Sequence, residues 1–318
     1  MPDKIIRATG EIAELRFVLL DATEAANTIG DFHGAHAFAR ILLGETIASA
    51  LLLASGLKAN GTAQVKFQFS GDFSVVSADA TPLGLVRAMV PTEDVRGIGD
   101  FEPLLSPQIM TVRKLNDKGI PMSEGIVEMP SENIGPSTAF YLLQSEQTKS
   151  AVGIKAKSDP TGTKLEFCGG YLVEAFPKAD EKTLAIMEQV IRSMPGLGHY
   201  HRPGQGLDLD ALLSDLAGPF RYTVHREIPV VAFCPCSEAG VMKALTGLPR
   251  TELEEIIIRS ETMELHCEYC RKRYLATPDQ VRGILEKMDT TPEPDEADDP
   301  EVDPAGDPAG DPDVEAPL

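Results

Sequence analysis

The sequence lacks basic residues where its acidic residues are most concentrated. Residues 289–318 contain 12 Asp and Glu side chains and no Lys or Arg. This segment supplies −12 of the formal net charge of −20, which leaves −8 for residues 1–288. The negative net charge of residues 1–288 disfavours a surface that binds nucleic acid or an anionic membrane. The short run Arg271-Lys272-Arg273 is the best candidate for a local basic patch.

Long apolar runs and an N-terminal targeting segment are also lacking. The N-terminus shows no basic segment followed by an apolar stretch, so no signal peptide is expected. The most apolar run, Ile41–Leu57, contains Glu45 and is shorter than the roughly 20 residues of a bilayer span. We therefore expect a buried helix there and a cytoplasmic protein. In that reducing compartment, paired cysteines indicate metal binding or redox chemistry more than permanent disulfides.

The order of strand and helix signals predicts an α+β fold for an N-terminal domain of residues 1–177. Val65, Phe67 and Phe69 alternate with polar residues, which is the period of a strand with one buried and one solvent-exposed face. A long helix, or two shorter ones, is expected over Phe32–Leu57. Further strands are predicted at Lys4–Arg7, Ile12–Leu20, Phe73–Ala78, Leu85–Val90, Ile109–Val112, Ala151–Lys157 and Lys164–Phe176, with a helix at Ser137–Ser145.

Three further segments complete the predicted organisation. Residues 178–233 are predicted to form a helical linker. Two stretches in this segment have narrow apolar stripes, which favour docking on a neighbouring surface. A small unit over residues 234–288 holds four cysteines. The acidic, proline-punctuated residues 289–318 cannot bury enough apolar area to fold and are predicted to be a disordered tail. The stripes are Leu184, Met187, Ile191 and Met194, and Leu209, Leu212, Leu213 and Leu216.

Four of the five cysteines fall into two close pairs, Cys234-Pro235-Cys236 and Cys267-Glu268-Tyr269-Cys270, with 30 residues between the pairs. Four thiolates in two close pairs are a typical tetrahedral ligand set for Zn²⁺. The segment between the pairs contains two helix signals that can bring the pairs face to face. The sequence therefore predicts one zinc ion held by Cys234, Cys236, Cys267 and Cys270.

Other interpretations of the second pair stay open. Cys267 and Cys270 could form an oxidoreductase site, although the strand and helix of a thioredoxin-like fold are not evident around them. His266 could replace a cysteine as a ligand, although four thiolates already complete the shell. His266 and Arg271-Lys272-Arg273 either offset the negative charge of such a site or are solvated surface residues.

The spacing of the first pair favours a switch over an inert structural site. Cysteines one residue apart lie near the outer limit of the Cα separation that a disulfide tolerates, so a bond between Cys234 and Cys236 should be strained. Strained disulfides have higher reduction potentials and are more often regulatory.

The pattern Cys-x-Cys, about thirty residues, Cys-x-x-Cys near the C-terminus resembles the heat shock protein 33 family of redox-regulated chaperones. Neighbouring residues agree, and the resemblance covers residues 3–286. The sequence departs from the family at Glu238-Ala239-Gly240, at Thr148-Lys149 and in its acidic tail. The matching segments are Cys236-Ser237, Ala244-Leu245, Leu248-Pro249, residues 263–270, Tyr274, Ser145-Glu146-Gln147, Gly169-Gly170-Tyr171-Leu172 and Phe176-Pro177.

The resemblance implies an ATP-independent holdase chaperone and no enzyme. In that family the reduced, zinc-bound form is dormant. Oxidation joins neighbouring cysteines, here Cys234 with Cys236 and Cys267 with Cys270, releases zinc and unfolds the switch and linker. The exposed apolar surface then binds unfolded or oxidatively damaged client proteins during stress, and the resemblance implies a homodimer for the oxidised chain. No Gly-x-x-x-x-Gly-Lys sequence is present, which agrees with ATP-independence.

The remaining candidates carry weaker predictions. Cys168, beside two glycines, is expected to be a buried packing residue. The pairs His33 with His36, and His199 with His201, have metal-compatible spacing but no partner ligands. Asp208–Asp215 lacks the glycine of a calcium loop and is expected to begin a helix. The rival functions are a nucleic-acid-binding protein that uses Arg271-Lys272-Arg273, and an enzyme with Cys267 as its nucleophile.

Overall fold

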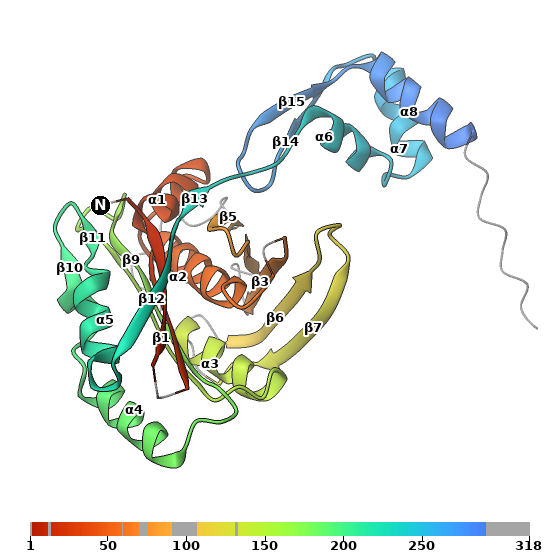
Figure 1. The fold of residues 1–318 in the computed structure, drawn as a ribbon. Helices are drawn as coiled ribbons and strands as arrows, with labels where there is room; N and C mark the ends of the chain where they lie inside the picture. The colour runs from red at the N-terminus through yellow and green to blue at the C-terminus, as the bar shows by residue number, and fades with distance from the viewer. Residues whose placement is uncertain are drawn as a thin grey trace, which may run out of the picture. The chain divides into compact units, whose positions relative to one another are not determined.

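The computed structural model describes residues 2–11, 14–58, 60–69, 75–90, 107–130 and 133–290 (Figure 1). They form two compact units, and the fold is α+β as predicted. The first unit comprises residues up to Ser237 together with Leu265–Tyr274. The second comprises Glu238–Glu264 and the chain from Leu275 onward. All four cysteines of the two pairs belong to the first unit.

One face of the first unit is built on a five-stranded antiparallel sheet in the order β12-β1-β2-β9-β8. In strand β2, Phe17, Val18, Leu19 and Leu20 are all 0% exposed, because both faces of the sheet are covered. The strands are β1 (Lys4–Gly10), β2 (Leu15–Asp21), β8 (Ser150–Ser158), β9 (Leu165–Ala175) and β12 (Tyr222–Pro229).

A second, six-stranded sheet has the order β13-β5-β4-β3-β6-β7. Its strands pair antiparallel except β13, which runs parallel to β5. The alternation in β3 turns Val65, Phe67 and Phe69 inward, as predicted. The strands are β3 (Thr62–Phe69), β4 (Val75–Ala80), β5 (Leu85–Met89), β6 (Pro107–Leu115), β7 (Pro121–Glu128) and β13 (Val231–Ala232).

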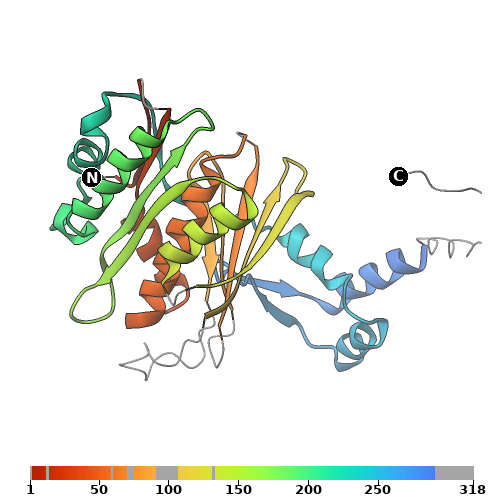
Figure 2. The same cartoon turned by 90° about the horizontal axis from the view of Figure 1, so that it is seen from below.

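Helices α1 (Thr23–Phe32), α2 (Ala37–Ala54) and α3 (Ile134–Ser145) form the layer between the two sheets (Figure 2). Their apolar side chains share one hydrophobic core with residues of both sheets. Among the described residues, α2 alone is long and apolar enough to cross a membrane, and 78% of it is buried. It is the buried helix that the apolar run predicts.

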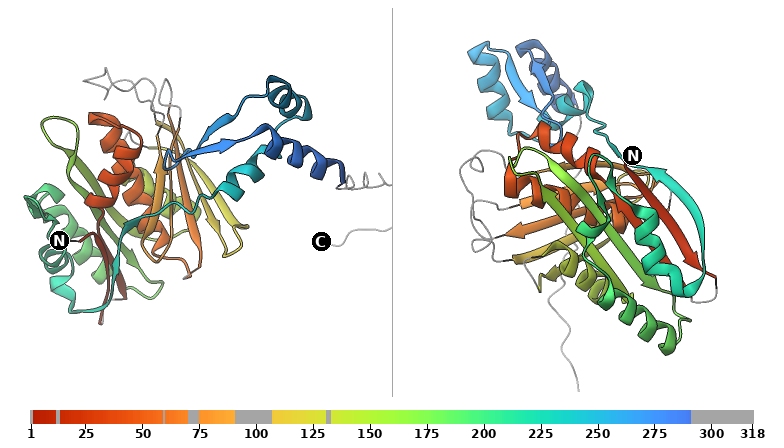
Figure 3. Two further views of the ribbon diagram at one scale, coloured as in Figure 1. Left: turned by 90° about the horizontal axis from the view of Figure 1, so that it is seen from above. Right: turned by 90° about the vertical axis from the view of Figure 1, so that its left-hand side faces the viewer.

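The outer face of the five-stranded sheet is covered by helices α4 and α5 (Figure 3). Phe17 and Leu19 from β2 share a second core with Leu212 and Leu216 from α5. The stripe on α5 thus docks on the sheet. Of the stripe on α4, Met187 is buried and Ile191 and Met194 are partly buried against the same core, whereas Leu184 is not part of it. The elements are α4 (Glu181–Ser193), η3 (Leu197–Tyr200), β10 (His201–Arg202), β11 (Gly206–Leu207), α5 (Leu209–Ala217) and η4 (Gly218–Phe220).

The second unit is a small helical group. Its buried apolar residues include Leu245, Leu253, Val281 and Leu285, and α8 contacts both α6 and α7. The helices are α6 (Glu238–Leu245), α7 (Arg250–Arg259) and α8 (Pro278–Thr290). Strands β14 (Met263–His266) and β15 (Arg273–Ala276) pair in a separate two-stranded sheet, and part of each belongs to the first unit.

Several elements differ from the sequence prediction. Phe32 ends the separate helix α1, which was not predicted, and α2 begins at Ala37. Strands β7 and β12 were also not predicted, and β12 lies within the segment expected to be a helical linker. Ile12, Ala13, Phe73, Ser74 and residues 291–318, which carry parts of the strand and tail predictions, lie outside the described residues. The three boundaries between the four predicted segments stay predictions.

Candidate metal centre

The second sheet positions the first cysteine pair. Strand β13 runs parallel to β5, with Val231 opposite Leu85 and Ala232 opposite Val86. The N–H of Phe233 extends this pairing by donating to the carbonyl of Val86 at 2.8 Å. Cys234 is the next residue, so the backbone that leads into the pair is fixed to the sheet.

The second pair lies on a tight turn between β14 and β15. The N–H of Cys267 donates to the carbonyl of Lys272 at 3.0 Å, and the N–H of Arg271 donates back to the carbonyl of Cys267 at 2.8 Å. Arg271 has a φ of 55°, in the left-handed region that lets the chain reverse direction. These two bonds close the loop that carries Cys267 and Cys270.

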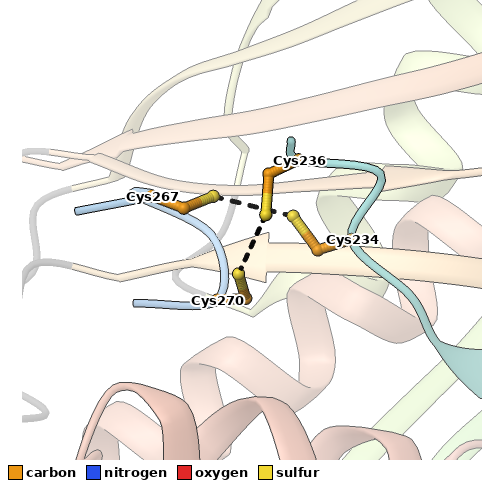
Figure 4. Close-up of side chains that lie close together, drawn as sticks. All are labelled: Cys234, Cys236, Cys267 and Cys270. Atoms are coloured by element: carbon orange, nitrogen blue, oxygen red, sulfur yellow. Dashed lines mark hydrogen bonds between the residues drawn. The ribbon is translucent and has the colours of Figure 1, made fainter. Parts of the chain in front are cut away.

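The four sulfurs converge (Figure 4), and all lie within 4.8 Å of one another. Cys234 Sγ is 3.6 Å from Cys267 Sγ, and Cys236 Sγ is 3.4 Å from Cys270 Sγ. All four cysteines are free, since a disulfide would bring two sulfurs to about 2.05 Å. Ligands about 2.3 Å from a tetrahedral metal lie about 3.8 Å apart, so this group of thiols fits a metal ion.

The hydroxyl of Tyr274 distinguishes one of the four thiols. It donates a hydrogen bond to Cys236 Sγ at 3.1 Å. Burial by itself would raise the pKa of Cys236, but bonds from Tyr274 and the neighbouring thiols lower that pKa to about 7. Burial raises the pKa of Cys234, and burial together with the other thiols raises the pKa of Cys270 to about 12. The thiols are therefore unequal, and Cys236 ionises most readily of these three.

The basic residues of the turn make their own contacts. Arg271 pairs with Glu268 at 3.2 Å, and the Lys272 ammonium lies 5.3 Å from the centroid of the Tyr274 ring. His266 is exposed and is not part of the group of four sulfurs. The structure thus brings the four cysteines together in a group that could hold a metal ion, and their role as zinc ligands stays a prediction.

The other sequence candidates lie elsewhere in the described part of the chain. Cys168 is 0% exposed, as predicted, and its Sγ donates to the carbonyl of Gly44. Burial raises the pKa of this thiol well above its usual value. His201 packs on Phe167 with ring centroids 5.3 Å apart, and His199 packs on Tyr200. Among the described residues, none of the histidines joins a metal-type cluster.

The calcium-loop candidate begins a helix, as expected. Asp208 precedes α5, and its side chain accepts the N–H of Ala211.

Sequence reasoning missed the contacts that Tyr274 and His33 make. Tyr274 follows the second pair by four residues, and that proximity was its only local signal. His33 was considered as a metal ligand with His36, but its Nε2 faces two backbone carbonyls. Nothing local in the sequence indicates those partners.

The fold and the site define an α+β protein with a four-cysteine centre that could hold a metal ion. A family model described as Hsp33 protein matches residues 3–277. The chain therefore belongs to the Hsp33 family.

Individual relatives agree with this assignment. A 33 kDa chaperonin of Streptococcus uberis is 29% identical over 290 residues, covering 89% of this chain and 98% of its own length. A 33 kDa chaperonin of Streptococcus pneumoniae is 30% identical over 279 residues, covering 86% and 94%. The crystal structure of the 33 kDa chaperonin (heat shock protein 33 homolog) of Thermotoga maritima matches the fold with a TM-score of 0.78 at 21% identity, covering 91% of this chain and all of that one.

Proposed function

We propose that this protein is a redox-regulated, ATP-independent holdase chaperone rather than an enzyme. The observation that carries the proposal is the group of four unbridged cysteine sulfurs within 4.8 Å, in a chain of the Hsp33 family. Its partners would be unfolded or oxidatively damaged client proteins in the cytoplasm, and the oxidised chain would form a homodimer.

The proposed metal is one Zn²⁺ ion per chain, held by Cys234, Cys236, Cys267 and Cys270. Four sulfur donors without an oxygen ligand favour zinc over hard cations such as Mg²⁺ or Ca²⁺. When bound, zinc would keep all four cysteines as thiolates and add its binding free energy to the folding of this region.

The cysteines themselves would sense the oxidant. Cys236, whose pKa without metal is lowered to about 7, would be available as a thiolate nucleophile for peroxide even where zinc does not hold it. Its sulfur would attack one peroxide oxygen, forming a sulfenic acid and releasing hydroxide. The Cys234 sulfur would then displace that oxygen and close the disulfide, and the oxygen would leave as hydroxide if Cys234 is a thiolate or as water if it is a thiol. Cys267 and Cys270 would react alike, so each pair gives up two electrons to one peroxide.

The covered face of the five-stranded sheet would supply the client-binding surface. Phe17 and Leu19 lie under α5, and their core also includes Leu212. Strand β12 joins α5 to β13 and so to Cys234 along the chain. Loss of order at the cysteines would release the segment from α5 to β13, starting at its C-terminal end, next to Cys234. Apolar surface of the sheet and of α5 would then be open to clients.

In this scheme residues 1–177 are the chaperone domain, 178–233 the linker, 234–288 the switch and 289–318 the tail.

The test compares reduced and peroxide-oxidised protein in one assay. Light scattering by a heat-denatured client should drop with the oxidised form and little with the reduced form. It should rise again after reductant and zinc are added. Zinc release and disulfide mapping by mass spectrometry are followed in the same samples. Dominant links between the two pairs would contradict the pairing, equal suppression by both forms would remove the switch, and no suppression would favour the nucleic-acid alternative.

A further inference from the structure

Tyr269 lies between the two ligand-type cysteines of the second pair and makes contacts of a different kind from theirs. The guanidinium of Arg87 lies over its ring, 3.9 Å from the centroid. Burial, together with the nearby Asp79 carboxylate, raises the pKa of the Tyr269 hydroxyl to about 12. A cation on an aromatic face is a stabilising contact. The ring of Tyr269 is therefore held by Arg87 of β5, and its hydroxyl lies near Asp79 of β4.

The residues that hold Tyr269 are themselves fixed. Asp79 and Arg87 are directly opposite in the β4–β5 ladder. The Asp79 carboxylate accepts two bonds from Arg87, at 2.9 Å from Nε and 2.7 Å from Nη2. The Asp79 side chain is 7% exposed and the Arg87 side chain 30%, so this ion pair is shielded from solvent mainly on its Asp79 side.

A third contact comes from the end of helix α1. His33 is 5% exposed, and its Nε2 lies 2.9 Å from the carbonyl oxygen of Tyr269 and 3.1 Å from that of Ala88. Both partners are acceptors, so the ring carries its proton on Nε2 and donates it between them. His33 thereby ties the backbone of the second cysteine turn to β5.

Three consecutive residues of β5 thus contact residues that lie beside or within the two cysteine pairs. The carbonyl of Val86 accepts the N–H of Phe233, which precedes Cys234. Arg87 covers Tyr269, and the carbonyl of Ala88 shares the His33 proton with Tyr269. The two pairs are far apart in sequence but are aligned by a single strand.

We propose that His33, Asp79 and Arg87 form a receptor for Tyr269 that positions the second cysteine pair and sets how long the centre retains its metal. The receptor acts through the backbone of the turn and does not touch the metal. The two pairs are then preorganised by the β-sheet, so the metal need not supply all of the ordering. This inference deepens the proposed function and rests on it for the identity of the metal.

The test uses the full-length reduced chain and zinc alone as the probe. The rate of zinc transfer to a chelating dye is measured for wild type, Tyr269→Phe, Tyr269→Leu, Arg87→Gln and the double variant. Tyr269→Leu and Arg87→Gln should each speed transfer by about tenfold, because a partly buried cation–aromatic contact is lost. Tyr269→Phe, which keeps the ring, should give a smaller increase. The double variant should be no faster than Tyr269→Leu, because both changes remove the same contact.

Arg113→Gln is the matched control. It removes an exposed ion pair with Glu124, 2.8 Å long, from the same sheet and should leave transfer unchanged. Additive effects of Arg87→Gln and Tyr269→Leu would overturn the receptor. So would transfer rates within twofold of wild type in folded variants.

Hydrogen exchange of residues 265–274, with and without zinc, provides a second readout. The receptor predicts protection in wild type that Tyr269→Leu loses even without metal. Equal exchange in both metal-free proteins would overturn it. If wild type lacks the oxidation-dependent chaperone activity while Tyr269→Leu still exposes this turn, the receptor stands and the proposed function fails.

Discussion

The hydroxyl of Tyr274 donates a hydrogen bond to Cys236 Sγ across 3.1 Å. It stabilises the thiolate and helps to bring the pKa of Cys236 to about 7, against the opposing effect of burial. Among Cys234, Cys236 and Cys270, the thiol that this phenol contacts is the one whose pKa is lowered.

Replacing Tyr274 by Phe should raise the pKa of Cys236 and slow its reaction at neutral pH. In metal-free, reduced wild type, alkylation of Cys236 should increase with pH around a midpoint near 7. In the variant the midpoint should move upward, so that alkylation at pH 7 falls several-fold because less thiolate is present. The measurement is site-resolved alkylation by mass spectrometry between pH 5 and 9, with Tyr222→Phe as the control. Superimposable profiles would mean that Tyr274 does not tune this thiol.

Replacing any one of Cys234, Cys236, Cys267 and Cys270 by Ser should weaken zinc binding strongly. A serine hydroxyl is a poor substitute for thiolate, and three sulfurs leave the shell incomplete. Cys168→Ser is the control, because this buried thiol bonds to the Gly44 carbonyl and lies outside the group of four. Zinc content is measured by elemental analysis after dialysis against a weak chelator. A Cys267→Ser, Cys270→Ser double variant with one zinc per chain would refute the ligand assignment.

Replacing Leu212 by Ala should partly activate the reduced protein as a chaperone. Leu212 is 0% exposed in the core between α5 and the five-stranded sheet. Its truncation should cost about 2–5 kcal/mol of that packing, which weakens the docking of α5. The assay is client light scattering with reductant present throughout. Leu83→Ala, at a residue 49% exposed, is the control and should behave as wild type. If Leu212→Ala is unstable yet still inactive when reduced, α5 does not cover the client surface.

The buried carboxyl of Asp3 should make the protein less stable as the pH rises towards neutral. It is 5% exposed, and burial raises its pKa to about 7, with a further contribution from Asp21. Because the unfolded value is near 3.9, the folded state holds an extra proton between about pH 4 and 7. The free energy of unfolding should therefore fall with rising pH in this window, by up to about 1.4 kcal/mol per pH unit, and level off above it.

Asp3→Asn removes that proton and should flatten the decline. Denaturant unfolding at pH 5, 6, 7 and 8 measures the slope, with the exposed Asp117→Asn as control. Asp21, whose pKa burial also raises, would leave a residual slope. Unchanged slopes in Asp3→Asn would show that Asp3 does not carry the pH dependence.

Much of the fold could be predicted where one local pattern dominates. The alternation in β3 and the apolar run of α2 each reflect burial that is periodic in sequence. The missed elements have weaker signals. Helix α1 buries one face, but around Ile29 that face consists of small residues such as Ala25, Ala26 and Gly30 and lacks large apolar side chains. Strand β12 is mostly exposed and is a strand because β1 supplies its hydrogen-bond partners.

The sequence by itself determined the metal-type ligand set, since each cysteine pair is local and its spacing restricts what it can bind. It also determined that the stripes of residues 184–194 and 209–216 need an apolar partner. Only the tertiary structure decided which thiol the Tyr274 hydroxyl contacts and which strand lies beside both pairs. Tyr274 and Cys236 are 38 residues apart, and His33 and Tyr269 are 236 apart. Contacts over such separations depend on how the sheets and helices pack together, and no periodicity along the chain encodes them.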